Sequence, residues 1–253
     1  MAAGGVILEV EGVSKNFGAL AALSRVGFAV SQGQVFSVIG PNGAGKSTLF
    51  NVVSGLYAPN AGRVVFRGRE ITGLPPERIN RLGIAKTFQI TNVFPEISVG
   101  ENVGVAAQSR SAESGRLASL WRTADVEARV TELLEAFGLV ARRDELAENL
   151  SHGEQRYLEI CLALATEPTL LLLDEPTAGM TPGETKDATE MIRRLALARG
   201  LTVLLIEHDM SVVMGISDRV AVLHFGEKIA EGTPEAIRND PRVIEAYLGG
   251  GGD

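Results

Sequence analysis

The chain has 253 residues, of which 45% are hydrophobic and 22% are charged, and its formal net charge is −7. This length fits one large α/β domain but not two nucleotide-binding domains in tandem, and the composition is too apolar for a disordered chain. Because the charge balance is acidic, the composition argues against a nucleic-acid-binding surface as the main function, and we expect no nucleic-acid partner.

The single cysteine and the absence of long apolar runs limit where the protein can work. Cys161 has no second cysteine with which to form a disulfide, which fits a reducing compartment, and its apolar neighbours predict a buried side chain. No uncharged apolar run approaches the ~20 residues that span a bilayer. We therefore expect any role at a membrane to require a partner.

Two extended stretches open the chain. Residues 7–13 alternate apolar and polar side chains, as a half-buried strand does, and residues 21–30 form the second stretch. We expect both strands to be antiparallel and peripheral. Phe17 lies in a turn between them, where it either stacks on an adenine ring or caps the core, and its spacing alone does not choose between the two.

An apolar strand over residues 35–39 leads into a glycine-rich turn and the start of a helix. The spacing G-x-x-x-x-G-K-S predicts a phosphate-binding loop. Its glycines allow left-handed backbone conformations, so that N–H groups turn inward around a phosphate, and the helix adds the positive end of its dipole. The lysine reaches the β- and γ-phosphates, and the serine hydroxyl binds Mg²⁺. The nucleotide-binding residues of this loop are Gly40, Pro41, Asn42, Gly43, Ala44, Gly45, Lys46, Ser47 and Thr48.

The next stretch changes from short α/β elements to helices. Residues 63–66 predict a strand, residues 74–77 open a helix with proline near its start, and residues 84–89 predict a strand ending at Gln89. From residue 90 the pattern is helical, and a polar loop is expected at residues 109–115. The apolar residues at helical spacing follow a capping box formed by Ser98 and Glu101, and they are Val126, Val130, Leu133, Leu134 and Phe137.

Four consecutive leucines, residues 170–173, precede Asp174 and Glu175. Leucines also suit a helix, but Pro168 and Pro176 allow only a short element, which favours a fully buried parallel strand. Its carboxylates then lie at the end where open α/β sheets bind ligands. Asp174 and Glu175 can supply a metal ligand and a group that activates water, and the alternative is a pair of solvated loop carboxylates.

The C-terminal part repeats the strand and helix pattern. Residues 181–184 form a capping box that begins a helix ending at Gly200, and residues 201–206 form a buried strand that ends before His208. Residues 219–223 and 228–230 predict a hairpin around Phe225 and Gly226, and Thr233 caps a last helix.

The segment 150–156 lies directly before an apolar helical run. Ser151 is an ordinary N-cap candidate, but a helix N-terminus that carries serine and Gly153 is also a ready anion site. Local chemistry leaves both interpretations open.

Together these motifs resemble the ATP-binding cassette (ABC) family of transporter ATPases, and the likeness covers nearly the whole chain. Residues 40–48 resemble the Walker A loop, residues 170–175 the Walker B strand and residues 150–154 the signature segment. Gln89 resembles the glutamine of the family's glutamine loop, and His208 its switch histidine. The resemblance implies an α/β phosphate-loop NTPase core with a mostly parallel sheet, peripheral antiparallel strands and an inserted helical subdomain.

The resemblance also implies a role for each site residue, with ATP and Mg²⁺ as cofactors. Phe17 stacks on adenine; Ser47, Asp174 and Gln89 hold Mg²⁺. Glu175 is the general base, Gln89 also couples the metal site to the helical subdomain, and His208 contacts the γ-phosphate. Ser151 and Gly153 touch ATP bound to the opposite subunit, because two cassettes of this family enclose two nucleotides head to tail.

At the level of the assembly, the resemblance implies a single ABC ATPase domain, residues 1–253, with its helical subdomain at about 90–165. The expected partners are membrane-spanning permease subunits, a second ATPase subunit that is either a copy of this chain or a sister protein, and indirectly an extracellular or periplasmic solute-binding protein. The expected location is the cytoplasmic side of the inner (plasma) membrane, as a peripheral subunit. Within residues 90–97, Val93, Phe94 and Ile97 either contact the permease or pack inside the helical subdomain.

Departures from the commonest family pattern narrow the resemblance. His152 and Glu154 replace the usual glycine and glutamine, and Thr181 stands where aspartate is frequent. These features are similar to the branched-chain amino-acid uptake branch, above all to the larger of its two ATPase subunits. Cassettes for urea and short-amide uptake or lipopolysaccharide export look similar. A cassette acting on DNA or ribosomes, or an unrelated phosphate-loop kinase or GTPase, fits the motifs less well.

Overall fold

The computed structural model describes residues 5–87, 93–111 and 119–248. The first of its two sheets is antiparallel, with the strand order β2-β1-β4-β5. The predicted peripheral antiparallel strands are thereby confirmed, although Phe17 is the last residue of a strand rather than part of a turn. The strands of this sheet are β1 (Val6–Phe17), β2 (Leu20–Ser31), β4 (Ala61–Phe66) and β5 (Arg69–Glu70).

The second sheet has the order β10-β9-β3-β8-β7-β6, and its neighbours are parallel except for β10 with β9. Every residue of β3, β7 and β8 is buried, as continuous apolar runs predict for strands covered on both faces. The four leucines therefore form a strand, as expected. The strands of this sheet are β3 (Val35–Ile39), β6 (Ile84–Lys86), β7 (Leu170–Asp174), β8 (Thr202–Ile206), β9 (Arg219–His224) and β10 (Glu227–Gly232).

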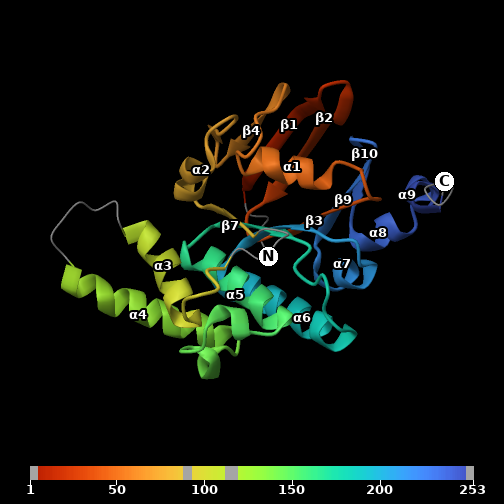
Figure 1. Ribbon diagram of the computed structural model, residues 1–253. Helices are drawn as coiled ribbons and strands as arrows, with labels where there is room; N and C mark the ends of the chain where they lie inside the picture. The colour runs from red at the N-terminus through yellow and green to blue at the C-terminus, as the bar shows by residue number, and fades with distance from the viewer. Residues whose placement is uncertain (1–4, 88–92, 112–118, 249–253) are drawn as a thin grey trace.

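The main sheet lies between two apolar layers, because alternate residues of its strands point to opposite faces. On one face, Leu170 and Leu172 of β7 join a core with β1, β2 and helix α1 (Lys46–Val53). On the other face, Leu171 and Leu173 pack with the helices that follow β6. Figure 1 shows α1 and the antiparallel sheet on one side of the main sheet and α5 and α6 on the other.

Among the described residues, three helices and two short 3-10 turns lie between β6 and β7. The capping box of Ser98 and Glu101 is present, with Glu101 accepting from the Ser98 N–H at 2.8 Å. The predicted polar loop is wrong for Ser109–Ser111, which complete α3, and residues 112–118 lie outside the described residues. These elements are α3 (Val99–Ser111), α4 (Ser119–Ala136), η2 (Val140–Arg142), η3 (Ala147–Asn149) and α5 (His152–Ala165).

The remaining helices surround the main sheet. The helix that ends at Gly200, whose φ is 59°, is confirmed, but the single last helix expected after Thr233 is two helices, α8 and α9. Among the described residues no helix is both long and apolar enough to span a membrane. These helices are α2 (Pro76–Leu82), α6 (Pro182–Arg199), α7 (Met210–Ile216), α8 (Pro234–Arg238) and α9 (Pro241–Leu248).

Candidate functional site

The loop between β3 and α1 has the backbone that the glycine pattern predicts. The φ angles of Gly40, Gly43 and Gly45 are 151°, 78° and 98°. A Cβ on Gly40 would lie 2.1 Å from the carbonyl oxygen of Leu223, so the loop passes too close to β9 for any side chain there. The loop can therefore turn its N–H groups towards one point, at the N-terminus of α1.

Lys46 folds back onto this loop. Its Nζ donates to the carbonyl oxygens of Gly40 at 2.7 Å and Pro41 at 3.0 Å. Burial lowers the pKa of Lys46, while the carboxylates of Glu175 and Asp174 raise it. An ammonium held by loop carbonyls between two carboxylates is a charge that phosphate oxygens can attract without a large movement.

Asp174 ends strand β7 and is buried among polar groups of the neighbouring strand β6. Its Oδ2 lies 3.8 Å from the Nζ of Lys86, which also donates to Asn51 Oδ1 at 2.6 Å. Its backbone N–H donates to Thr87 Oγ1 at 3.4 Å. Burial raises the pKa of Asp174, and Lys86 provides the strongest opposing effect.

The second carboxylate oxygen of Asp174, Oδ1, is buried and accepts no hydrogen bond from any residue that the structure describes. A buried oxygen of this kind is costly unless something binds it. Ser47, at the start of α1, presents an exposed hydroxyl in the adjoining pocket. A carboxylate and a hydroxyl are oxygen ligands of the type that Mg²⁺ takes, so these residues fit the predicted metal.

Glu175 follows Asp174 directly and has a left-handed backbone, with φ of 50°. Its N–H donates to the Ile206 carbonyl of β8 at 3.0 Å, which fixes the turn after β7. Its Oε1 lies 3.7 Å from Nδ1 of His208, whose ring is largely exposed. The ends of β7 and β8 thus bring together two of the predicted catalytic side chains.

A buried carboxylate, Glu207, joins the loops that follow these two strands. Its Oε1 accepts from the Thr177 hydroxyl at 2.6 Å, and its Oε2 accepts from the His208 N–H at 3.1 Å. Glu207 is fully buried. No role for Glu207 follows from the sequence, because a glutamate at the end of a strand gives no local sign that it will turn inward.

A pocket of about 490 Å³ opens over the glycine-rich loop. Phe17 is partly exposed there, and its ring packs edge-on against Tyr57, with ring centroids 5.3 Å apart. Phe17 is therefore available to a ligand as well as packed on a neighbour. The residues that line the pocket are Phe17, Leu20, Ala21, Ala22, Asn42, Gly43, Ala44, Gly45, Lys46, Ser47, Thr48, Glu175 and Phe225.

The signature segment lies at the N-terminus of α5 and does not line this pocket. Ser151 is the N-cap, and Glu154 accepts from its N–H at 2.8 Å. Glu154 also accepts from Arg142 at 3.2 Å, and its pKa is lowered, first by the backbone hydrogen bond from Ser151. The capping interpretation of Ser151 is confirmed, whereas anion binding by Ser151 and Gly153 stays a prediction.

The other departures from the family pattern also have structural partners. The imidazole of His152 lies against Gly179, in the loop after β7, so closely that a Cβ added to Gly179 would be 3.0 Å from the ring. Thr181 caps α6 in the predicted capping box with Glu184, whose carboxylate accepts from the Thr181 N–H at 2.8 Å. Gln89, the remaining predicted catalytic and metal-binding residue, lies outside the described residues.

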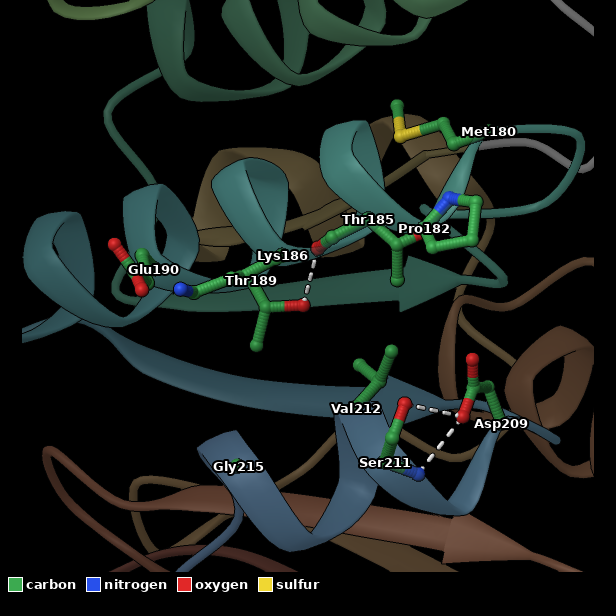
Figure 2. Close-up of a pocket in the computed structure, with 10 residues that line it drawn as sticks. All are labelled: Met180, Pro182, Thr185, Lys186, Thr189, Glu190, Asp209, Ser211, Val212 and Gly215. Atoms are coloured by element: carbon green, nitrogen blue, oxygen red, sulfur yellow. Dashed lines mark hydrogen bonds between the residues drawn. The ribbon is translucent and has the colours of Figure 1, made fainter.

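A separate cavity of about 520 Å³ lies between α6 and α7 (Figure 2). In it, Asp209 Oδ1 accepts from the N–H and the hydroxyl of Ser211, at 2.7 and 2.6 Å, and caps α7. Thr189 donates to the Thr185 carbonyl at 2.6 Å on α6. These polar groups stabilise their own helices, whereas residues 42–48 of the predicted phosphate loop line the other pocket.

Two kinds of comparison with known proteins agree. The family model described as ABC transporter matches residues 23–178, and the model described as branched-chain amino acid ATP-binding cassette transporter matches residues 227–253. The high-affinity branched-chain amino acid transport ATP-binding proteins LivG of Salmonella typhimurium and BraF of Pseudomonas aeruginosa are each 44% identical over 250 residues. The match covers 96% of this chain and 98% of each relative.

Solved structures agree as well. A nucleotide-free ATP-binding cassette from an ABC transporter is 34% identical, with a TM-score of 0.84, over 96% of this chain and 99% of that chain. An ABC transporter cassette in its ADP conformation is 34% identical, with a TM-score of 0.83, over 97% of this chain and 99% of that chain. The predicted fold and the likeness to the branched-chain amino-acid branch are confirmed, and the chain belongs to the ABC transporter family, as an ATP-binding and ATP-hydrolysing subunit.

Proposed function

We propose that this chain is the ATPase subunit of an importer for branched-chain amino acids. The names of the 44% identical relatives support this solute class, as does the branched-chain family model over residues 227–253. The subunit works at the cytoplasmic face of the inner membrane as a peripheral protein, docked on membrane-spanning permease subunits. The chain forms one cassette domain, residues 1–253, whose helical subdomain spans about residues 90–165.

The observation that carries the ATPase mechanism is that Lys46, Ser47 and Glu175 line one pocket, with Asp174 directly before Glu175 at the end of β7. ATP enters with its phosphates over the loop of residues 40–48, where the backbone N–H groups bind them. The Nζ of Lys46 then donates to phosphate oxygens in place of the carbonyls of Gly40 and Pro41. Phe17 stacks on the adenine, while its contact with Tyr57 keeps the ring in place.

Ser47 and Asp174 would hold Mg²⁺, and Gln89, outside the described residues, would complete the protein's share of the ligands. The buried Oδ1 of Asp174 that lacks a donor among the described residues supports this assignment. When bound, Mg²⁺ neutralises charge on the β- and γ-phosphate oxygens. Lys86, near Oδ2, prevents Asp174 from being an isolated buried charge.

Glu175 accepts a proton from the attacking water as general base, and its backbone bond to Ile206 fixes the direction from which it acts. His208 contacts the γ-phosphate. Because Glu207 holds both the His208 N–H and the Thr177 hydroxyl, the loops that carry Glu175 and His208 keep a constant spacing. Together these groups position one water and one phosphoryl group for in-line displacement.

Two cassettes enclose the nucleotides, and Ser151 and Gly153 at the N-terminus of α5 contact the ATP bound to the opposite subunit. The second ATPase subunit is a sister protein or a second copy of this chain. ATP binding favours the closed pair, and hydrolysis restores the open one. The work done on the permease is at most the difference between the free energies with which the closed and open pairs bind ATP.

The permease contacts the segment before α3, and a solute-binding protein contacts the permease in turn. Phe94 is 54% exposed, although its backbone N–H is held by Asn102 Oδ1 at 2.8 Å. Val93 instead packs against the core, and Ile97 is only partly exposed. Phe94 is therefore the side chain of this segment best placed to meet a partner.

The test is purification of the tagged chain from the membranes of its source organism, with identification of co-purifying proteins by mass spectrometry. Recovery of two multi-span proteins and a second ATPase would support the importer, and an amino-acid-binding protein would support the solute class. Recovery of ribosomal or DNA-repair proteins with no membrane protein would overturn the transport role. A second test uses the Phe94→Asp variant, which should no longer co-purify with the permease but should still bind nucleotide.

A further inference from the structure

Phe225 is the most exposed of the large hydrophobic side chains that the structure describes, at 80%. It lies in the turn between β9 and β10 with a φ of 46°, a left-handed conformation that residues with a Cβ rarely adopt. Both features cost free energy in the isolated chain, and glycine at this position would avoid both. A phenylalanine held in this way is a candidate for a contact with a ligand.

The turn that carries Phe225 is fixed to the phosphate loop. The N–H of Gly226 donates to the Ala44 carbonyl at 3.1 Å, and the Gly226 carbonyl accepts from the Ser24 N–H at 2.8 Å. A Cβ on Gly226 would lie 2.8 Å from the Ala22 carbonyl oxygen, so the turn lies directly against strand β2. The backbone of Phe225 thus has a defined position relative to any phosphate bound in the loop.

The side chain of Phe225 lines the same pocket as Phe17. The other residues that line this pocket include Leu20 and Ala22 of β2 and residues 42–48 of the phosphate loop. The ring of Phe225 packs at 49° against that of His224, with centroids 4.3 Å apart, which restricts its rotation. Two exposed aromatic rings therefore border one pocket of about 490 Å³ that residues 42–48 of the phosphate loop also line.

We propose that Phe225 is a second aromatic contact for the bound nucleotide, covering the nucleoside part of ATP while Phe17 stacks on the base. Contact with the face of a base or with the C–H edge of a ribose is favourable for an aromatic ring, and this contact needs no hydrogen bonds. Covering Phe225 also removes its apolar surface from water. This inference rests on the nucleotide-binding role proposed above.

The test uses ligands with and without a nucleoside. The dissociation constants of ADP and of inorganic tripolyphosphate would be measured by calorimetry for the full chain, for Phe225→Ala and for Phe225→Trp. We expect Phe225→Ala to weaken ADP about tenfold and to leave tripolyphosphate unchanged, because only ADP presents a base and a sugar. Phe225→Trp should restore ADP affinity. Leu197→Ala, which removes another exposed apolar side chain far along α6, is the matched control and should change neither.

Three results would overturn the inference. Unchanged ADP affinity in Phe225→Ala means that the ring does not touch the nucleotide. If Phe225→Ala weakens only ATP-driven dimerisation, the Phe225 ring contacts a second copy of the chain instead. Equal weakening of ADP and tripolyphosphate would mean that the substitution disturbs the phosphate loop through Gly226. If the unmodified chain binds neither ligand, the proposed nucleotide site itself is wrong, which is a separate outcome.

Discussion

Substituting alanine for Gly45 tests whether the phosphate loop has room for a side chain. Gly45 is the N-cap of α1 with φ of 98°, and a Cβ there would lie 2.4 Å from the Ala22 carbonyl oxygen and 3.0 Å from a methyl of Leu23. The left-handed backbone costs about 1–2 kcal/mol for a residue with a Cβ. The clash with the backbone of β2 adds about 1–3 kcal/mol, as overpacking does. Gly45→Ala should therefore lower the free energy of unfolding by about 2–5 kcal/mol.

Gly43→Ala is the matched control, because Gly43 has φ of 78° but no atom within 4 Å of the added Cβ. It should lose only the conformational part, about 1–2 kcal/mol. The assay is urea denaturation of both variants, with the midpoint and slope fitted together so that a change in slope is not mistaken for a change in stability. Equal losses in the two variants would refute the steric argument, since the left-handed backbone is the only cost they share.

Further predictions concern the residues around the pocket. Glu175→Gln should bind ATP and dimerise but lower kcat by about a hundredfold or more, measured by phosphate release, because the general base is gone; normal turnover would remove Glu175 from that role. Thr177→Val should lower the free energy of unfolding by about 1–3 kcal/mol, since the buried Glu207 loses the donor at 2.6 Å. Glu207→Gln keeps an acceptor oxygen, so a smaller decrease in the free energy of unfolding would support this role of the hydrogen bond. An unchanged free energy of unfolding in Thr177→Val would contradict it. Glu154 has a pKa below its ordinary value of 4.5, chiefly because the Ser151 N–H donates to it, so the folded state favours its ionised form. Its stabilising contribution relative to Glu154→Gln should be present above about pH 4.5 and disappear as the pH falls through the lowered pKa; a stability difference that is independent of pH would contradict this.

Local signals predicted the parts of the fold and site that depend on neighbouring residues in the sequence. The glycine pattern predicted the left-handed backbone at Gly40, Gly43 and Gly45, and the prolines on either side of the four leucines predicted a short strand. The capping boxes at Ser98 and Thr181 were also correct, because their partners lie three residues away. Each of these features is decided within one turn or one strand.

Other features depend on contacts between distant segments, which one sequence does not show. Lys86 is an ordinary lysine at the end of a strand until β6 pairs with β7 and brings it to 3.8 Å from Asp174. The sequence predicts Phe225 only as part of a hairpin turn, because nothing local shows that Gly226 beside it bonds to Ala44 of the phosphate loop. The start of α9 has a local signal that the prediction of a single last helix did not use: Asp240 Oδ1 accepts from the Arg242 N–H at 2.9 Å, and Pro241 is the first residue of the helix.

The order of strands explains why residues so far apart in the chain meet at one edge of the sheet. In the sheet, β3 lies between β9 and β8, and β7 lies between β8 and β6. Since these strands are parallel, their carboxyl ends share one edge, and the phosphate loop, Glu175, His208 and Thr87 each follow the strand that presents them. Phe225 follows β9 at the same edge, on the far side of the phosphate loop from Asp174. Strand β6 directly precedes α3, α4 and α5, and Lys86 at its end lies 3.8 Å from Asp174 of β7. One pair of parallel strands therefore connects the helices that follow β6 to the buried carboxylate of Asp174.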